Sequence, residues 1–344
     1  MIALPRSMPR TASHVLGAGG SRQGERRGML ARVALLGEVD ARTFAVLDDR
    51  YGVVRMRSGA VANKRALAAC EVLVTNGLQG VTADELDRFP ALKLVASLGS
   101  GVDTDALGEC RARGLQVTNT PGVLAEDVAD LALGLLIAAV RRICVGHDFV
   151  RNGRWPAGRM PLTGSLRGAR VGMIGLGKTG RALARRLVAC GVEMSYHCYR
   201  TKSDIDYRFW PDLIEMAKYS TILVACCPGG DATRGIVSRE VLSAIGPRGT
   251  FVNVGHGSVV DEPAMIELLE TGRLGAAALD VFADEPNVPE ALMALDNVVL
   301  QPHQGSATAD ARHAMSNQLI DNIEALFAGR ALLSPVDDDG AGDY

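Results

Sequence analysis

The stretch Arg170–Gly180, RVGMIGLGKTG, indicates how this chain folds. An apolar run ends in Gly175-Leu176-Gly177-Lys178-Thr179-Gly180, and a pattern with helical spacing follows at once. This order of strand, glycine turn and helix is typical of dinucleotide binding. Gly175 permits the turn, Gly177 lets the backbone approach a pyrophosphate, and Gly180 lets the helix pack on the strand. The phosphates would lie at the helix N-terminus, where free N–H groups favour negative charge. The alternative is an ordinary turn between a strand and a helix.

Short apolar strands alternate with helical stretches on both sides of this turn. The alternation predicts an α/β protein with doubly wound parallel sheets, and 344 residues are enough for two domains. We expect strands at Arg32–Gly37, Cys70–Thr75, Leu92–Leu98, Leu115–Asn119, Arg170–Ile174, Glu193–Tyr199, Thr221–Cys226, Gly249–Val254, Ala276–Val281 and Val298–Gln301.

One apolar stretch, Glu126–Val145, raises the question of a membrane span. Its acidic residues at 126, 127 and 130 and its arginines at 141 and 142 leave too short an apolar run to cross a bilayer. We therefore predict one long buried helix and no membrane association.

The composition narrows the functional classes. Hydrophobic residues make up 47% of the chain and charged residues 22%, which is typical of a soluble globular protein. A net charge of −2 gives no reason to expect a nucleic-acid partner or an anionic membrane surface. The seven cysteines are scattered without a CxxC pair, so we expect reduced thiols in the cytoplasm, with neither a disulfide framework nor a metal site.

Residues 1–28 differ from the rest because they are rich in arginine and glycine and have no apolar periodicity. They lack the central apolar run of a secretory signal. We expect a disordered extension, or a chain that starts at Met29; the arginines leave an organelle transit peptide as the alternative.

The strand Glu193–Tyr199 is followed by Arg200, Thr201 and Lys202. An NAD-binding fold has an acidic residue near this position to bind the ribose hydroxyls, and a 2′-phosphate needs cations instead. No acid stands here, so the pattern favours NADP(H), with NAD(H) as the second choice. A solvated basic turn is the alternative.

Two further stretches come directly after predicted strands. Leu98-Gly99-Ser100-Gly101 has two glycines that free backbone N–H groups at a sheet edge, and it is either a cradle for a substrate carboxylate or a tight turn. Glu285 and His303 each follow another strand. A histidine exchanges protons near neutral pH, and a carboxylate beside it would orient its ring, which suits proton transfer during hydride chemistry. Taken singly, each is as easily explained as a surface residue.

Seven stretches, in order and at family-like spacing, resemble the D-isomer-specific 2-hydroxyacid dehydrogenases, and most of all the bacterial glyoxylate/hydroxypyruvate reductases. They are NTPGVLAEDVADLALGLL, GRWP…PLTGSLRG, VGMIGLGKTGRALA, CPGG, FVNVGHGSVVDEPA, ALDVFADEP and VVLQPHQGSA. The resemblance implies two Rossmann-like domains with the site in a cleft between them. The substrate domain would comprise residues 29–127 and 313–335, the NADP(H) domain residues 128–312, and residues 336–344 would be a tail.

The resemblance also implies roles for individual residues. His303 matches the family's acid/base, Glu285 matches its partner carboxylate, and Leu98–Gly101 matches the substrate carboxylate loop. Further cofactor contacts are implied at Cys227, Pro228, Val254, Gly255, Asp280 and Gly305, Asp280 matching the residue that holds the nicotinamide carboxamide. Family members are usually homodimers that act on small 2-oxo or 2-hydroxy acids.

The chain departs from the family at His256, where the motif has an arginine that binds the substrate's carboxylate and carbonyl. Histidine is shorter, donates fewer hydrogen bonds and is only partly charged near neutrality. A charge-assisted hydrogen bond contributes roughly 1.5–3 kcal/mol. Its loss would slow turnover on the order of ten- to a hundredfold.

Two functions are therefore expected. The first is an NADPH-dependent reductase of glyoxylate or hydroxypyruvate, with His256 as a third catalytic-site residue that impairs or retunes it. The second is a non-catalytic NAD(P)-binding regulatory protein, similar to a corepressor, on the same fold. The joint presence of Glu285 and His303 favours the first.

Overall fold

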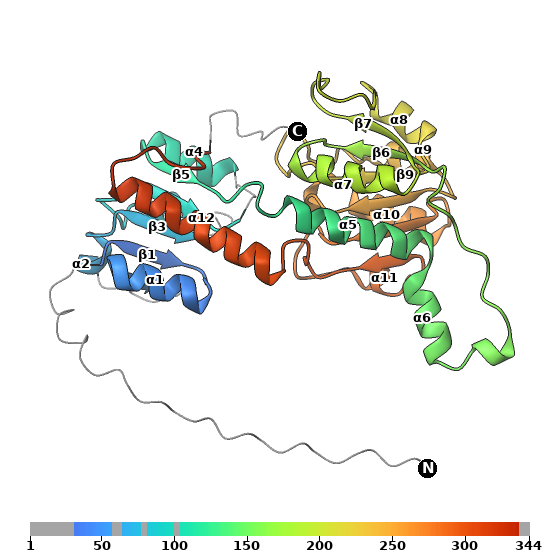
Figure 1. The fold of residues 1–344 in the computed structure, drawn as a ribbon, viewed down its shortest axis with the longest axis horizontal. Coiled ribbons are helices and arrows are strands. Elements are labelled where there is room, and N and C mark those ends of the chain that lie inside the picture. The colour runs from blue at the N-terminus through green and yellow to red at the C-terminus, as the bar shows by residue number, and fades with distance from the viewer. Residues whose placement is uncertain (1–30, 57–63, 77–80, 100–103, 337–344) are drawn as a thin grey trace, which may run out of the picture.

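Two parallel sheets, each flanked by helices, lie side by side along the long axis of the molecule (Figure 1). The structure is a computed structural model, and it describes residues 31–56, 64–76, 81–99 and 104–336. The predicted extension 1–28, Ser100 and Gly101 lie outside these ranges. The predicted fold class of two doubly wound, Rossmann-like sheets is confirmed.

The smaller sheet has the strand order β2-β1-β3-β4-β5, which is a doubly wound order. Its register places Val33 of β1 between Val53 of β2 and Val72 of β3. We call this part of the molecule the five-stranded domain. Its elements are β1 (Val33–Leu36), α1 (Ala41–Tyr51), β2 (Val53–Met56), α2 (Lys64–Leu67), β3 (Val72–Thr75), α3 (Ala83–Leu86), β4 (Leu94–Ser97), α4 (Thr104–Ala112) and β5 (Gln116–Thr118).

The larger sheet has the order β12-β11-β10-β9-β6-β7-β8, and we call this part the seven-stranded domain. The strand order reverses between β6 and β9, and ligands of open parallel sheets bind at such a point. Its strands are β6 (Arg170–Ile174), β7 (Glu193–His197), β8 (Arg208–Phe209), β9 (Ile222–Ala225), β10 (Thr250–Asn253), β11 (Ala276–Leu279) and β12 (Val298–Leu300). Its helices are α5 (Ala125–Val140), α6 (Ile143–Arg151), α7 (Lys178–Ala189), α8 (Leu213–Tyr219), α9 (Arg239–Ile245), α10 (Glu262–Glu270) and α11 (Glu290–Met293), with short 3-10 turns at Trp155–Ala157 and Gly257–Val259.

Both faces of each sheet are buried, which explains why the strands read as continuous apolar runs. On one face of the larger sheet α5 and α7 pack together through alanine and leucine side chains. The small alanines let the helices approach the strands closely, and this face carries the dinucleotide turn.

The predicted helix Glu126–Val145 is in fact two helices. α5 ends at Val140, and Arg142 takes a left-handed conformation (φ 50°) before α6 begins at Ile143. Apolar residues stand directly on both sides of Arg141 and Arg142, so the two arginines could equally lie on the exposed side of one continuous helix. Because of the break, α6 turns away from the domain and has no buried residue. Within the described chain no helix combines the length and apolarity that a bilayer crossing requires.

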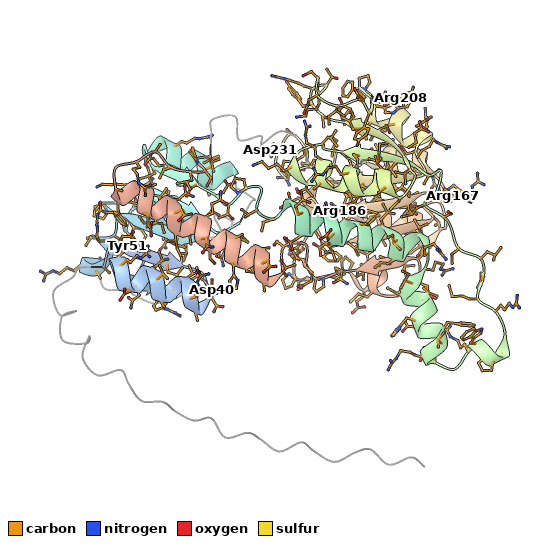
Figure 2. All side chains as sticks on the ribbon, in the orientation of Figure 1. Asp40, Tyr51, Arg167, Arg186, Arg208 and Asp231 are labelled. Atoms are coloured by element: carbon orange, nitrogen blue, oxygen red, sulfur yellow. The ribbon has the colours of Figure 1, made fainter. Side chains whose placement is uncertain are left out.

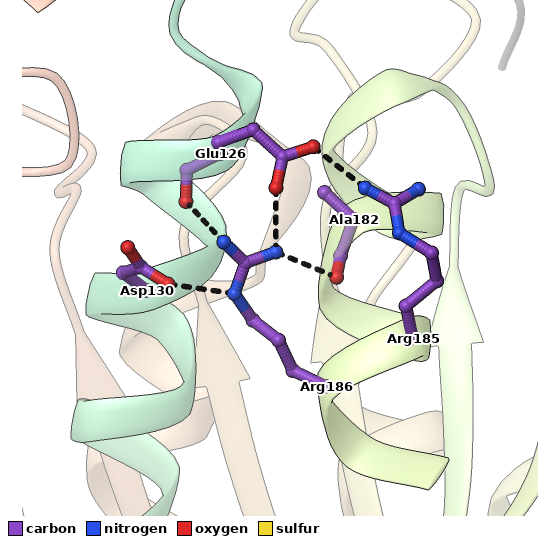
Figure 3. Close-up of polar contacts among 5 residues, drawn as sticks. All are labelled: Glu126, Asp130, Ala182, Arg185 and Arg186. Carbon is purple, nitrogen blue, oxygen red and sulfur yellow. Dashed lines mark hydrogen bonds and ion pairs between the residues drawn. The ribbon is translucent and has the colours of Figure 1, made fainter. Parts of the chain in front are cut away.

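The N-terminal turn of α5 is tied to α7 by a cluster of ion pairs (Figure 3). The Arg186 guanidinium donates to Asp130 (2.6 Å), to Glu126 (2.8 Å) and to the Ala182 carbonyl (2.9 Å), while Arg185 donates to Glu126 (2.6 Å). Exposed ion pairs of this kind contribute little individually, but a shared guanidinium fixes direction. The cluster therefore fixes the direction in which α5 begins, relative to α7, after the connection from the five-stranded domain.

The C-terminal helix α12 (Ala309–Phe327) returns to the first sheet. Leu319, Ile320 and Ile323 join the core formed by β1, β3 and β4. At the crossing, Thr308 donates its hydroxyl to Asp127 (2.8 Å). The chain thus passes between the domains twice. The exact domain boundaries stay predictions.

Candidate active site

The predicted functional residues of the larger sheet follow its strands at their carboxyl ends. Gly175 follows β6, Cys227 follows β9, Val254–His256 follow β10, Asp280 follows β11 and His303 follows β12. Since the strands are parallel, these segments share one edge. Figure 2 shows that Asp231, in the loop after β9, lies on the side of this domain that faces the five-stranded domain.

The glycine turn has the close contacts that a dinucleotide turn requires. Gly175 has φ +89°, and a Cβ there would lie 2.8 Å from the Cys227 nitrogen; a Cβ on Gly180 would lie 2.5 Å from the Gly175 carbonyl. The N-cap of α7, Gly177, makes no side-chain hydrogen bond, and the first turn has no acidic residue. The helix end is therefore open to an anion, and these residues fit a dinucleotide.

The basic turn Arg200–Lys202, after β7, is positioned by hydrogen bonds to Tyr196. Its buried hydroxyl accepts the Lys202 N–H (2.9 Å) and lies 3.4 Å from the Thr201 hydroxyl. Arg200 is exposed, and its guanidinium lies 5.5 Å from the Tyr199 ring. Where an acid would contact ribose, the buried Cys198 sulfur accepts the Leu176 N–H (3.1 Å).

One carboxylate that was not predicted to take part, Asp204, lies close to this turn. Asp204 forms a two-pronged ion pair with Arg181 of α7 (2.6 and 3.1 Å). The Arg181 hydrogen bond is the main cause of the lowered pKa of Asp204. Its charge is therefore engaged by α7 and leaves the basic character of the turn in place.

His303 and Glu285 form the pair that the sequence predicted. The Nδ1 of His303 lies 2.7 Å from one Glu285 oxygen, and the other oxygen accepts the Phe282 N–H (3.0 Å). His303 has φ +53°, which is uncommon outside glycine and directs the ring toward the loop after β11. With Nδ1 engaged, Nε2 is the ring atom that can meet a substrate.

Asp280 holds the segment that carries His303. Its carbonyl accepts the His303 N–H (3.0 Å), and its carboxylate accepts the N–H groups of Gln304 (2.6 Å) and Gly305 (2.8 Å). The side chain is buried, and burial raises its pKa while the two backbone hydrogen bonds lower it. The structure thus shows Asp280 shaping the histidine turn; its predicted contact with a nicotinamide stays a prediction.

The hydrogen bonds of His256 favour an uncharged ring. Its Nδ1 accepts the Ser258 N–H (3.2 Å) and lies 2.9 Å from the Ser258 hydroxyl. A backbone N–H can only donate, so Nδ1 has no proton and the single donor is Nε2–H. Burial lowers the pKa of His256, the negative charge of Glu285 raises it, and the charges of His303 and Arg234 lower it further. His256 is therefore a poor substitute for a guanidinium.

The segment that carries His256 packs against Gly229 and is held by Gly257 and Asn253. The sequence had not singled out these three residues. A Cβ on Gly229 would lie 2.6 Å from the His256 ring, and a Cβ on Gly257 would lie 1.8 Å from the Phe282 carbonyl. Buried Asn253 donates to the His256 carbonyl (3.0 Å) and accepts the Gly255 N–H (3.1 Å). The glycine pair in CPGG was the available signal for this packing.

In the predicted carboxylate loop, Gly99 has a hydrogen-bond partner within the chain. Its N–H donates to the Thr120 hydroxyl (3.0 Å), and its carbonyl accepts the Thr120 N–H (2.8 Å). This amide is consequently engaged within the chain. Leu98 packs with Leu124 and Met315 where the domains join. The amides of Ser100 and Gly101 lie outside the described residues, and their substrate role stays a prediction.

A surface groove lies at the opposite edge of the larger sheet. It is lined at the amino ends of β9–β12 by Thr250 and Asn297, and on its outer side by Arg142 and Leu162. The Nε of Arg142 is buried without a hydrogen-bond partner in the described structure. Because it lies at the amino ends of the strands, the groove is separate from the site.

The sheets, the open glycine turn and the Glu285–His303 pair define a two-domain, dinucleotide-dependent oxidoreductase fold. Residues 133–305 match the pattern of the D-isomer specific 2-hydroxyacid dehydrogenase, NAD binding domain. The chain belongs to the D-isomer specific 2-hydroxyacid dehydrogenase family.

Named relatives agree with this membership. The chain is 46% identical to glyoxylate/hydroxypyruvate reductase A of Arabidopsis thaliana, over 77% of this chain and 84% of the relative. It is 45% identical to hydroxyphenylpyruvate reductase of Plectranthus scutellarioides over the same shares. A crystal structure of the NADPH-dependent glyoxylate/hydroxypyruvate reductase of Sinorhizobium meliloti, in complex with NADP and malonate, superposes with a TM-score of 0.84 at 37% identity, covering 92% of this chain and 99% of that one.

The charge state of His256 can be measured. We expect NMR titration to show a neutral Nε2–H ring at neutral pH and a pKa below the ordinary 6.5. Glu285→Gln should lower this pKa further, because it removes a negative charge. Arg234→Gln should raise it, because it removes a positive one. Arg167→Gln, on the far side of the domain (Figure 2), is the matched control. A ring that is protonated at pH 7 would contradict the assignment.

Proposed function

We propose that this protein reduces small 2-oxo acids, glyoxylate or hydroxypyruvate, to 2-hydroxy acids with NADPH. The observation that carries the proposal is the 2.7 Å contact between Glu285 and the Nδ1 of His303. A bound nicotinamide supplies the hydride that the carbonyl carbon receives. His303 donates a proton from Nε2 to the carbonyl oxygen, and the Glu285 carboxylate stabilises the protonated ring before that transfer.

The residues at the carboxyl edge fit NADP(H). The pyrophosphate would be held by the turn Gly175–Gly180 and the open end of α7. The 2′-phosphate would be held by Arg200, Thr201 and Lys202. Cys227, Pro228, Val254, Gly255, Asp280 and Gly305 stand at the ends of β9–β12, where the nicotinamide end would lie. The named NADP-bound relative supports the cofactor choice.

Removal of the proton donor should abolish turnover without abolishing cofactor binding. His303→Ala is expected to lower kcat roughly a hundred- to ten-thousandfold, as for other general acids. Glu285→Gln should have a smaller effect, because the ring keeps a hydrogen-bonding neighbour but loses its counter-charge. Oxidation of NADPH with glyoxylate, hydroxypyruvate and larger 2-oxo acids, hydroxyphenylpyruvate among them, would measure both.

Ser238→Ala, at the N-cap of α9, serves as the control for this series and should leave kcat unchanged. If the unaltered protein binds NADPH but oxidises it with none of these acids, the second function is favoured. That function is a non-catalytic NAD(P)-binding regulator. Unchanged kcat in His303→Ala would contradict the assignment of the acid.

The cofactor preference has its own test. We expect NADPH to bind more tightly than NADH, and Arg200→Asp to narrow or reverse the difference by repelling the 2′-phosphate. Arg167→Asp makes the same charge change on the far side of the domain (Figure 2) and should leave the ratio unchanged. Tighter binding of NADH by the unaltered protein would show that the basic turn has been misinterpreted.

We also propose that the protein acts as a homodimer in the cytoplasm. The arm formed by α6 and the segment after it projects from the seven-stranded domain (Figure 1). It exposes Ile143, Val150, Trp155 and Leu162, the last with 99% of its surface. The arm borders the groove in which the Arg142 Nε has no described partner, so a second copy would cover both. The seven free cysteines support a reducing compartment.

The arm predicts a change of oligomeric state. Trp155→Lys and Leu162→Lys together should yield monomers in sedimentation experiments, because a cation would have to be buried at the interface. Val188→Lys, at an exposed position on α7, should leave the dimer intact. A monomeric unaltered protein would contradict the proposal.

A further inference from the structure

Among the described residues of the site, position 256 offers no cation to a substrate carboxylate. A 2-oxo acid brings a carboxylate, but the His256 ring is neutral and donates through Nε2 alone. The Gly99 amide is engaged by Thr120. His303 must give up its proton during the reaction, so it cannot serve as a lasting counter-charge. A cationic side chain elsewhere at this edge would supply the charge that position 256 does not.

The loop after β9 brings an arginine beside His256. Thr233 donates its hydroxyl to the Pro228 carbonyl (2.6 Å), which folds the loop back on itself. The Gly235 N–H donates to the Ser258 carbonyl (2.9 Å), and Val237 pairs in parallel with Val260. The chain around Arg234 therefore runs directly alongside the segment that begins at His256.

We propose that Arg234 binds the carboxylate of the 2-oxo acid, in place of the cation that is missing at position 256. The proposal rests on the proposed function for the identity of the substrate. It makes Arg234 a substrate-binding residue that sets the site's preference for acids over uncharged ketones.

The guanidinium of Arg234 is available for this role. Its ion pair with Asp231 is 3.5 Å long, and the two side chains are 67% and 91% exposed. Such a contact is weak, so a substrate carboxylate can replace it. A guanidinium also offers two parallel donors to a carboxylate, which a neutral histidine cannot do.

The surroundings of His256 agree with this placement. The ring lies on Gly229, where a Cβ would come within 2.6 Å of it, so the ring and the loop after β9 are in contact. The charge of Arg234 also contributes to the lowered pKa of His256. Lys178 is another cation of this domain. Its Nζ lies against Gly122 beside the dinucleotide turn, where it is better placed for the phosphates.

Binding of oxamate, an unreactive 2-oxo acid analogue with one carboxylate, tests the proposal without turnover. Calorimetry on the full chain with NADP⁺ should show oxamate binding that Arg234→Gln weakens roughly ten- to a hundredfold. Arg234→Lys should retain part of the affinity, since it keeps the charge. Arg167→Gln, with the same loss of charge on the far side of the domain (Figure 2), should bind as the unaltered protein does.

A second variant tests whether Arg234 stands in for position 256. Adding His256→Arg to Arg234→Gln should restore oxamate binding, whereas His256→Arg alone should improve it only slightly. NADP⁺ affinity and melting temperature should be unchanged in Arg234→Gln, because the side chain is exposed. Oxamate binding within about twofold of the unaltered protein in Arg234→Gln would overturn the proposal. So would an unaltered protein that does not bind oxamate.

These experiments distinguish failure of the Arg234 site from failure of the proposed reductase function. If oxamate binding depends on Arg234 but no 2-oxo acid supports NADPH oxidation, the reductase fails and the carboxylate site stands. If NADPH is oxidised at equal kcat and KM by Arg234→Gln, the reductase stands and the role of Arg234 fails.

Discussion

The buried carboxylate of Asp280 links the ends of two neighbouring strands, and the geometry of the site depends on it. Burying a carboxylate is costly, and the N–H groups of Gln304 and Gly305 offset the cost by donating to its two oxygens. The Asp280 carbonyl meanwhile accepts the His303 N–H. Together these bonds hold His303 in its left-handed conformation, and only then does its ring reach Glu285. His303 is therefore positioned by the end of β11, although it follows β12.

The same edge carries the predicted proton donor, His303, and a histidine where the predicted substrate anchor would be an arginine. The His303–Glu285 pair and the glycine turn are formed as the family leads one to expect. His256, by contrast, uses its Nδ1 to cap the 3-10 turn at Gly257–Val259, so it is held neutral by the structure that it stabilises. An arginine on the adjoining loop can take over the charge without disturbing that cap. In this arrangement His303 and Glu285 would still carry out the proton transfer, and Arg234 would bind the substrate carboxylate.

Prediction from the sequence was most accurate where the signal was local and apolar. All ten expected strands are present within a few residues. β2 and β8 were missed because they lie at sheet edges, where only part of a short strand is buried and the apolar signal is weak. The break at Arg142 was missed because apolar residues resume directly after the two arginines, at Ile143. The engagement of the Gly99 amide was missed because its partner, Thr120, belongs to another strand end.

The sequence by itself determined the fold class, the dinucleotide turn and the residue types at the strand ends. These follow from periodicity and from glycines whose packing neighbours are close along the chain, as with Gly180 and the Gly175 carbonyl. The tertiary structure decided which of those side chains act together. The pairing of Glu285 with His303, the seat of His256 on Gly229 and the approach of the Arg234 loop to Ser258 each join separate strand ends. Such contacts depend on strand order and register, and these are set by packing across the whole sheet.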